Sequence, residues 1–92
     1  MKELEKALFK FCIYFSGGRS YEPIPMYLVI DMLVKVFGWN EKQMYYYVSK
    51  WDDKGIVNYG TSLRNVWFEF ENLSGPYRET YKQMFHKEGG VE

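Results

Sequence analysis

The chain has 92 residues, of which 47% are hydrophobic and 21% aromatic, and its 12 Lys and Arg balance its 12 Asp and Glu. This length suits one small domain, and so much apolar surface excludes wholesale disorder, because its burial offsets the entropy lost on ordering. Zero net charge excludes a broadly basic nucleic-acid-binding chain but allows a local basic patch. A single cysteine, and no long apolar run or leader pattern, lead us to expect a soluble cytoplasmic protein.

The N-terminal segment predicts a helix over residues 2–16, ended by Gly17 and Gly18, because glycine readily adopts the left-handed conformation at a helix end. Phe9 and Ile13 widen its apolar face, so we expect this helix to be covered on more than one side. Its main apolar stripe, which we expect to face the core, consists of Leu4, Ala7, Leu8, Phe11, Cys12 and Phe15.

A connector that could hold a short extended piece leads to a second predicted helix over residues 25–37. Pro25 suits the first helical position, where its missing N–H costs nothing, and Gly38 ends the segment. The helically spaced apolar residues are Leu28, Val29, Met32, Leu33, Val36 and Phe37.

A third helix is predicted over residues 40–54, after a turn short enough to make a helix-turn-helix. We expect the Asn40 side chain to accept from the backbone N–H of Gln43, whose own side chain could reach back, as in a capping box. Tyr45, Tyr46 and Tyr47 point in three directions, and of these only Tyr47 is expected to be buried. The residues expected to face the core are Met44, Val48 and Trp51.

After Gly55 the apolar period changes from that of a helix to that of a strand, which predicts a β-hairpin over residues 56–71 with its tip near residues 61–64. Val66, Phe68 and Phe70 would share one face and Trp67 the other. Ser74, Gly75 and Pro76 indicate the start of a short C-terminal helix over residues 75–87.

The order of helix, short extended piece, helix, turn, helix and hairpin resembles the winged helix-turn-helix family. The residues that carry the resemblance are Leu33 to Gly38, Asn40, Met44, Val48, Trp51 and Gly55 to Val57. The resemblance implies one α+β domain with three helices, a β-hairpin wing and an added C-terminal helix. It also implies that the third helix enters the major groove of DNA.

The face of the third helix opposite its core row carries side chains suited to that role, although the acidic Asp53 also lies on it and favours the alternative given below. Gln43 could pair with adenine, the lysines could meet phosphate or guanine, and the wing tip (Thr61, Ser62 and its neighbours) could hold the DNA backbone. Residues 35–64 hold five basic and three acidic groups, a slight basic excess. The candidate DNA-binding residues are Lys42, Gln43, Tyr46, Ser49, Lys50, Arg64 and Asn65. We therefore expect a small double-stranded DNA-binding regulator of transcription or replication.

The zero net charge and the abundance of aromatic residues support an alternative, a protein–protein interaction module or dimeric adaptor that does not bind DNA. The last helix could fold back on the core or pair with its twin in a homodimer. The candidate interface residues are Trp67, Tyr77, Tyr81 and Phe85.

Catalysis is not expected from this sequence, nor is a cofactor or a metal. His86 and Cys12 are the sole histidine and cysteine, too few for a zinc site, and Cys12 is expected to be a buried, inert thiol. Asp52 and Asp53 point about 100° apart on a helix, which suits solvation better than paired acid–base chemistry.

Overall fold

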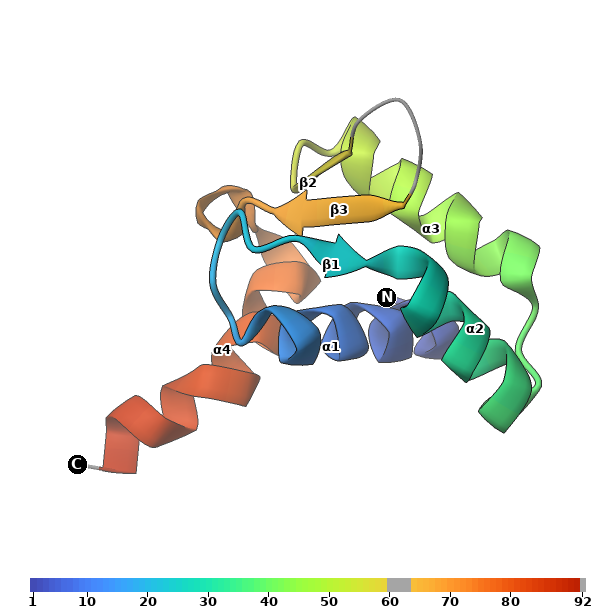
Figure 1. The fold of residues 1–92 in the computed structure, drawn as a ribbon. Helices are drawn as coiled ribbons and strands as arrows, with labels where there is room; N and C mark the ends of the chain where they lie inside the picture. The colour runs from blue at the N-terminus through green and yellow to red at the C-terminus, as the bar shows by residue number, and fades with distance from the viewer. Residues whose placement is uncertain (60–63, 92) are drawn as a thin grey trace.

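The computed structural model describes residues 1–59 and 64–91, with side chains as far as Phe85. This part of the chain forms an α+β fold with four α-helices and a three-stranded antiparallel sheet (Figure 1). The elements are α1 (Glu3–Ser16), β1 (Ile24–Pro25), α2 (Met26–Phe37), α3 (Glu41–Asp53), β2 (Val57–Tyr59), β3 (Asn65–Phe68), a 3₁₀ turn η1 (Phe70–Asn72) and α4 (Gly75–Val91).

The sheet has the order β1-β3-β2, so the connector between the first two helices contributes an edge strand. Ile24 lies opposite Val66 in β3, and the backbone N–H of Met26 donates to the Arg64 carbonyl over 3.1 Å. Pro25 is tolerated in β1 because an edge strand does not require every N–H. In Figure 1, α1 runs beneath the sheet, and the last turns of α4 extend away from the body.

The orientation of α1 differs from the one predicted. Phe9 is fully buried, and its ring makes edge contacts with Trp51, Phe68 and Tyr77 at centroid distances of 5.5, 5.6 and 5.4 Å. These three rings come from three other elements. By enclosing Phe9 they fix the rotation of α1 about its own axis, with Phe9 pointing into the core. The expected core stripe is therefore wrong in part: Phe15 is 43% exposed, and Leu4, Ala7 and Phe11 are only partly buried.

The predicted row of α2 is likewise only partly buried. Val29 and Leu33 lie in the core, joined by Met26 and Ile30, whereas Met32 is half-buried. The remaining members of the row are exposed, at 51% for Leu28, 66% for Val36 and 51% for Phe37. Only one side of α2 contacts the sheet and α3. Because the apolar row is wider than that side, its outer members stay exposed.

The core row of α3 is as expected, since Met44, Val48 and Trp51 are fully buried. Tyr47 is buried, as expected. The cap differs from the prediction in one detail: the Asn40 side chain accepts from the N–H of Lys42, over 2.8 Å, instead of that of Gln43. Both N–H groups are unpaired within the helix, so either contact satisfies one of them.

The strands are shorter than the predicted hairpin, and the chain turns into η1 at Phe70. Phe70 is buried all the same, because its ring stacks between those of Phe68, at 5.3 Å, and Tyr81, at 4.7 Å. Its backbone N–H donates to the hydroxyl of Ser20, which replaces a ladder bond. The wing-tip residues Thr61 and Ser62 lie outside the described residues.

Candidate functional site

The outward face of α3 carries polar side chains that no other described element covers. Lys42, Gln43, Ser49 and Asp53 are exposed, and Tyr46 is 62% exposed. The buried row on the opposite side packs against α1, α2 and β2, and this packing fixes the face's orientation. Four of the five candidate DNA-binding residues of this helix thus lie on one exposed surface.

Lys50, the fifth candidate on α3, is engaged elsewhere. Its Nζ lies 3.4 Å from Oε1 of Glu5, and its side chain is 38% exposed. The Glu5 side chain is only 1% exposed, so Lys50 neutralises a buried carboxylate of α1. A cation held in this way is less available to a phosphate than Lys42.

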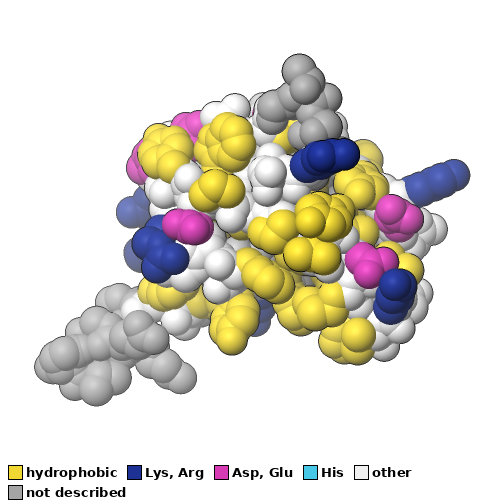
Figure 2. All heavy atoms as spheres, viewed as in Figure 1, with side chains coloured by type: hydrophobic (Ala, Val, Ile, Leu, Met, Phe, Trp, Pro, Cys, Tyr) yellow, Lys and Arg dark blue, Asp and Glu magenta, His cyan; other side chains and the backbone are white. Residues whose placement is uncertain are grey.

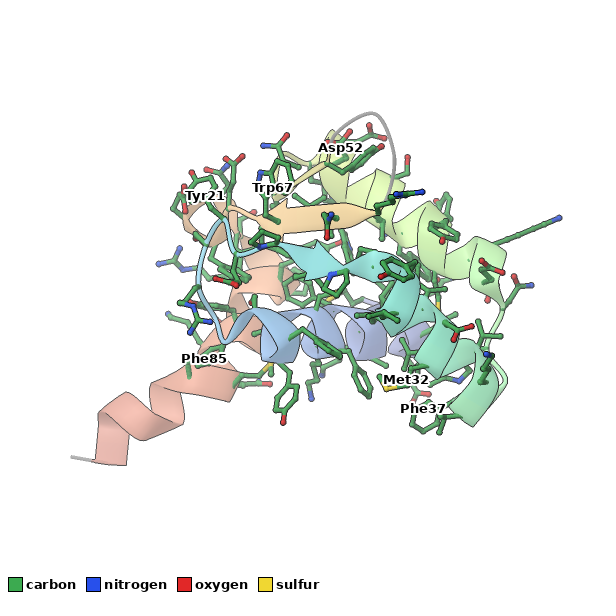
Figure 3. All side chains as sticks on the ribbon, in the orientation of Figure 1. Tyr21, Met32, Phe37, Asp52, Trp67 and Phe85 are labelled. Atoms are coloured by element: carbon green, nitrogen blue, oxygen red, sulfur yellow. The ribbon has the colours of Figure 1, made fainter. Side chains whose placement is uncertain are left out.

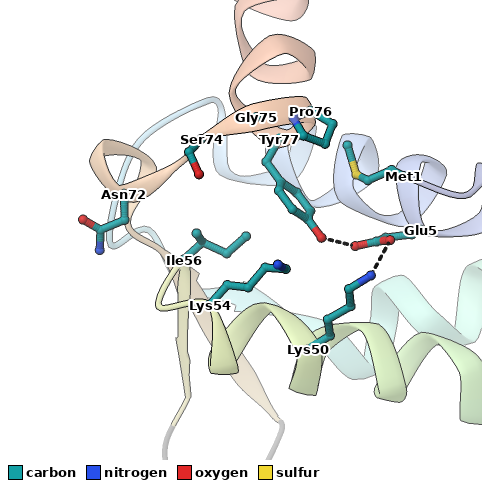
Figure 4. Close-up of a pocket in the computed structure, with 10 residues that line it drawn as sticks. All are labelled: Met1, Glu5, Lys50, Lys54, Ile56, Asn72, Ser74, Gly75, Pro76 and Tyr77. Atoms are coloured by element: carbon teal, nitrogen blue, oxygen red, sulfur yellow. Dashed lines mark hydrogen bonds and ion pairs between the residues drawn. The ribbon is translucent and has the colours of Figure 1, made fainter.

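Glu5 is the centre of a polar cluster that joins three helices (Figure 4). Its Oε2 accepts from the indole N–H of Trp51 on α3, over 2.9 Å, and from the Tyr77 hydroxyl on α4, over 2.5 Å. Burial alone would raise the pKa of the Glu5 carboxyl, but these two donors and Lys50 outweigh burial and hold that pKa below its ordinary value. Burial and the bond to Glu5 raise the pKa of Tyr77. The cluster therefore holds an ionised carboxylate inside the fold.

The burial of Glu5 was not predicted from the sequence, although the sequence carries a signal for it. Glu5 stands four residues before Phe9 and eight before Ile13, so it belongs to the row that proves to be buried. A glutamate in a buried apolar row needs hydrogen-bond donors for its carboxylate, because burying an unpaired charge is costly, and α3 and α4 supply these donors.

An open cleft of about 470 Å³ lies beside this cluster, lined by residues of α1, α3 and α4. Lys54 reaches over the Tyr77 ring there, with Nζ 5.8 Å from the ring centroid. The remaining lining includes Ser74 and Pro76 at the start of α4 and Asn72, whose amide donates to the Gly55 carbonyl over 2.9 Å. Its charged groups already contact one another or an aromatic ring, which suits a structural role.

The strands β2 and β3 are held in the sheet, whereas the side chains where β3 begins are exposed. Arg64 and Asn65 are exposed, and Asn65 is the first residue of β3, opposite Pro25. Trp67 is half-buried on the sheet face away from Phe68, where its register partner is Asn58. These positions leave Arg64 able to reach a ligand outside the fold.

The candidate interface residues of α4 mostly face inward. Tyr77 is 7% exposed, and its hydroxyl is used by Glu5. Tyr81 is half-buried, stacks on Phe70 and donates to the Gly18 carbonyl over 2.9 Å, while the half-buried Phe85 packs on Gly18. The first half of α4 thus folds back on the core, one of the two arrangements expected for it.

A second surface is apolar and lies across α1 and α2. We call it the α1–α2 face; it consists of Phe11, Tyr14, Phe15, Leu28, Met32, Val36 and Phe37. Phe11 and Phe37 join the two helices, with ring centroids 6.3 Å apart, and Tyr14 contacts Phe15 at 6.3 Å. Figure 2 shows hydrophobic side chains gathered over this side of the molecule, and Figure 3 labels Met32 and Phe37 beside the C-terminal half of α2.

Cys12 is buried, and burial raises the pKa of its thiol. Among the residues that the structure describes, no three His, Cys, Asp or Glu side chains gather in a way that could hold a metal ion. No helix within the described ranges combines the length and apolarity needed to cross a bilayer. The side chain of His86 lies outside the described residues.

Comparison of the chain with protein-family models, with curated proteins and with solved structures finds no match.

Proposed function

We propose that the chain is a winged helix-turn-helix module that binds double-stranded DNA through the outward face of α3. The observation that carries the proposal is the exposed row of Lys42, Gln43, Tyr46 and Ser49 on a helix whose other side is locked into the core. An α-helix fits the major groove, and this row offers donors and acceptors suited to base edges and phosphates.

The topology supports the same proposal. β1, from the connector between the first two helices, pairs with β3, which also pairs with β2 after the third helix. This arrangement is compatible with a winged helix. It leaves Arg64 exposed where β3 begins, so the arginine can contact backbone phosphates beside the groove.

The structure changes which cations the proposal uses. Lys50 is paired with Glu5, so Lys42 and Arg64 take over its role as phosphate contacts. Few cations imply modest affinity and a shallow dependence on salt, because each neutralised phosphate contributes about one unit to the salt slope.

The test is titration of labelled duplexes of mixed sequence at about 50 mM and about 200 mM salt, a range over which phosphate contacts change affinity measurably. Lys42→Ala and Arg64→Ala should each weaken binding and lower the salt slope by about 1. Gln43→Ala should change which duplex sequences the protein prefers more than it changes the mean affinity for duplexes of mixed sequence. Lys82→Ala, an exposed lysine on α4, is the matched control and should bind as the parent does.

The proposal fails if folded protein binds no duplex at the lower salt, or if the Lys42→Ala, Arg64→Ala double variant binds like the parent. A second candidate, a protein-binding module without DNA affinity, would then be favoured. The pairing of Lys50 with Glu5 and the apolar α1–α2 face both support that second candidate.

A further inference from the structure

The α1–α2 face has no partner within the described chain, although it is built from large apolar side chains. Tyr14 is 75% exposed and Phe15 43%, and on α2 the exposed fractions of Leu28, Val36 and Phe37 are 51%, 66% and 51%. Scattered apolar residues are ordinary on a protein surface, but a joined patch of this kind marks an interaction site.

We propose that a second copy of this chain covers the α1–α2 face, so that the protein is a two-fold symmetric dimer in which α2 packs against α2 of the other copy. This proposal goes beyond DNA binding and does not depend on it. It also moves the dimer contact away from α4, whose Tyr77 and Tyr81 serve the core.

The size of the face fits that occupant. Five large side chains that are about half exposed present roughly 100 Å² each, or about 500 Å² together. A standard interface buries about 800 Å² on each partner, of which about 57–65% is apolar, again about 500 Å². The face therefore supplies the apolar share of a complete dimer interface.

The charges beside the face favour a second copy of the same helix. Asp31 and Lys35 lie next to the apolar row on α2, 3.3 Å apart, with side chains 55% and 74% exposed. If two copies of α2 run antiparallel about a point between these residues, Asp31 of each copy lies opposite Lys35 of the other. The same arrangement brings Leu28 of one copy near Val36 of the second copy, because these two side chains share the exposed side of α2 beside the charged pair. A two-fold interface must complement itself in this way.

The first experiment measures the mass of the DNA-free parent protein by light scattering at about 100 µM, a concentration at which even a weak standard-size interface is occupied. We expect twice the chain mass of 11.1 kDa. Leu28→Lys with Val36→Lys should reduce the mass to that of one chain while circular dichroism keeps the parent's helix content. Tyr46→Lys, on the outward face of α3, is the control and should remain dimeric, since Tyr46 is 62% exposed outside the face.

A second experiment tests the antiparallel pairing of α2. Asp31→Lys and Lys35→Asp should each dissociate more readily than the parent, whereas an equal mixture of the two variants should regain dimers, because the heterodimer restores opposite charges at both contacts. A parent of one-chain mass, or a dimer that survives Leu28→Lys with Val36→Lys, would overturn the proposal. A mixture that regains no dimer would overturn the pairing of α2 with itself. None of these readouts requires DNA, so their failure is distinct from failure to bind a duplex.

Discussion

The two sides of α1 invert the usual distribution of polarity. Its inward side places Glu5 among Phe9 and Ile13 at 1% exposure, whereas its outward side leaves Tyr14 75% and Phe15 43% exposed. The buried carboxylate is stable because three donors from α3 and α4 reach it. Nothing in the described chain compensates the exposed rings in the same way.

The contrast shows that burial follows the available partners more closely than it follows residue type. A charge can be buried where converging elements supply hydrogen bonds and an opposite charge, because these offset the cost of desolvation. Apolar side chains stay exposed where no element remains to cover them, and that condition marks a surface for an external partner.

The largest effect is expected on the inward side. Glu5→Ala leaves the Trp51 indole and the Tyr77 hydroxyl without their acceptor and Lys50 without its counter-charge. Each of the two buried donors left without an acceptor costs about 1–3 kcal/mol, so the free energy of unfolding in urea should fall by about 2–5 kcal/mol. Glu3→Ala, an exposed glutamate of the same helix, is the control and should change stability by less than about 0.5 kcal/mol. Equal losses in the two variants would contradict the role assigned to Glu5.

A smaller loss is expected where α4 closes over the end of α1. Gly18 has φ +77°, and a Cβ there would lie 2.6 Å from the Phe85 ring. Gly18→Ala should therefore cost about 1–3 kcal/mol for overpacking in addition to the strain of the left-handed backbone. Gly38→Ala shares the positive φ, at +70°, but its Cβ would meet nothing within 4 Å. The difference in free energy of unfolding in urea between the two variants isolates the contact with α4. Equal losses would show that the Phe85 ring does not pack on Gly18.

Acid should weaken the inward side specifically. Since the folded-state pKa of Glu5 lies below its ordinary value of about 4.3, ionised Glu5 stabilises the fold above that value. This stabilisation is lost as the pH falls from the ordinary value through the folded-state value. Urea unfolding of the parent between about pH 6 and pH 3 should thus decline more steeply than that of Glu5→Gln, which has no proton to gain. Parallel curves would show that another carboxyl controls acid stability.

The smallest effect on the stability of one copy is expected on the outward surface. Val36→Ala removes atoms that are 66% exposed and should change the free energy of unfolding by less than about 0.5 kcal/mol in dilute protein. Val29→Ala, on the same helix but fully buried, leaves a cavity and should cost about 1–3 kcal/mol. Similar losses at both sites in dilute protein would mean that Val36 is covered within a single chain, which would contradict the exposed face.

The sequence predicted helices, turns and an inward row of α3 because those features depend on local chemistry. Asn40 caps α3, Gly38 takes a left-handed conformation after α2, and Met44, Val48 and Trp51 lie inside. Apart from its three tyrosines, α3 has only three apolar side chains, and all three lie on one side of the helix. That side is therefore the one that must face the core. The outward polar row could be predicted for the same reason.

The sequence predicted the inward side of α1 poorly because α1 is apolar around most of its circumference. Periodicity selects a side only when the opposite side is polar, and here Phe9 competes with Phe11 and Phe15. Neither the ion pair of Lys50 with Glu5 nor the contact of Phe85 with Gly18 could be predicted, since each joins residues more than forty positions apart.

By itself the sequence determined where the helices form and that extended chain follows α3, because capping, left-handed glycines and apolar spacing act over a few residues. Only the tertiary structure decided which of the many apolar side chains of α1 and α2 are buried and which stay exposed. The rotation of α1 depends on the rings of Trp51, Phe68 and Tyr77 closing around Phe9, and that packing leaves the α1–α2 face in solvent.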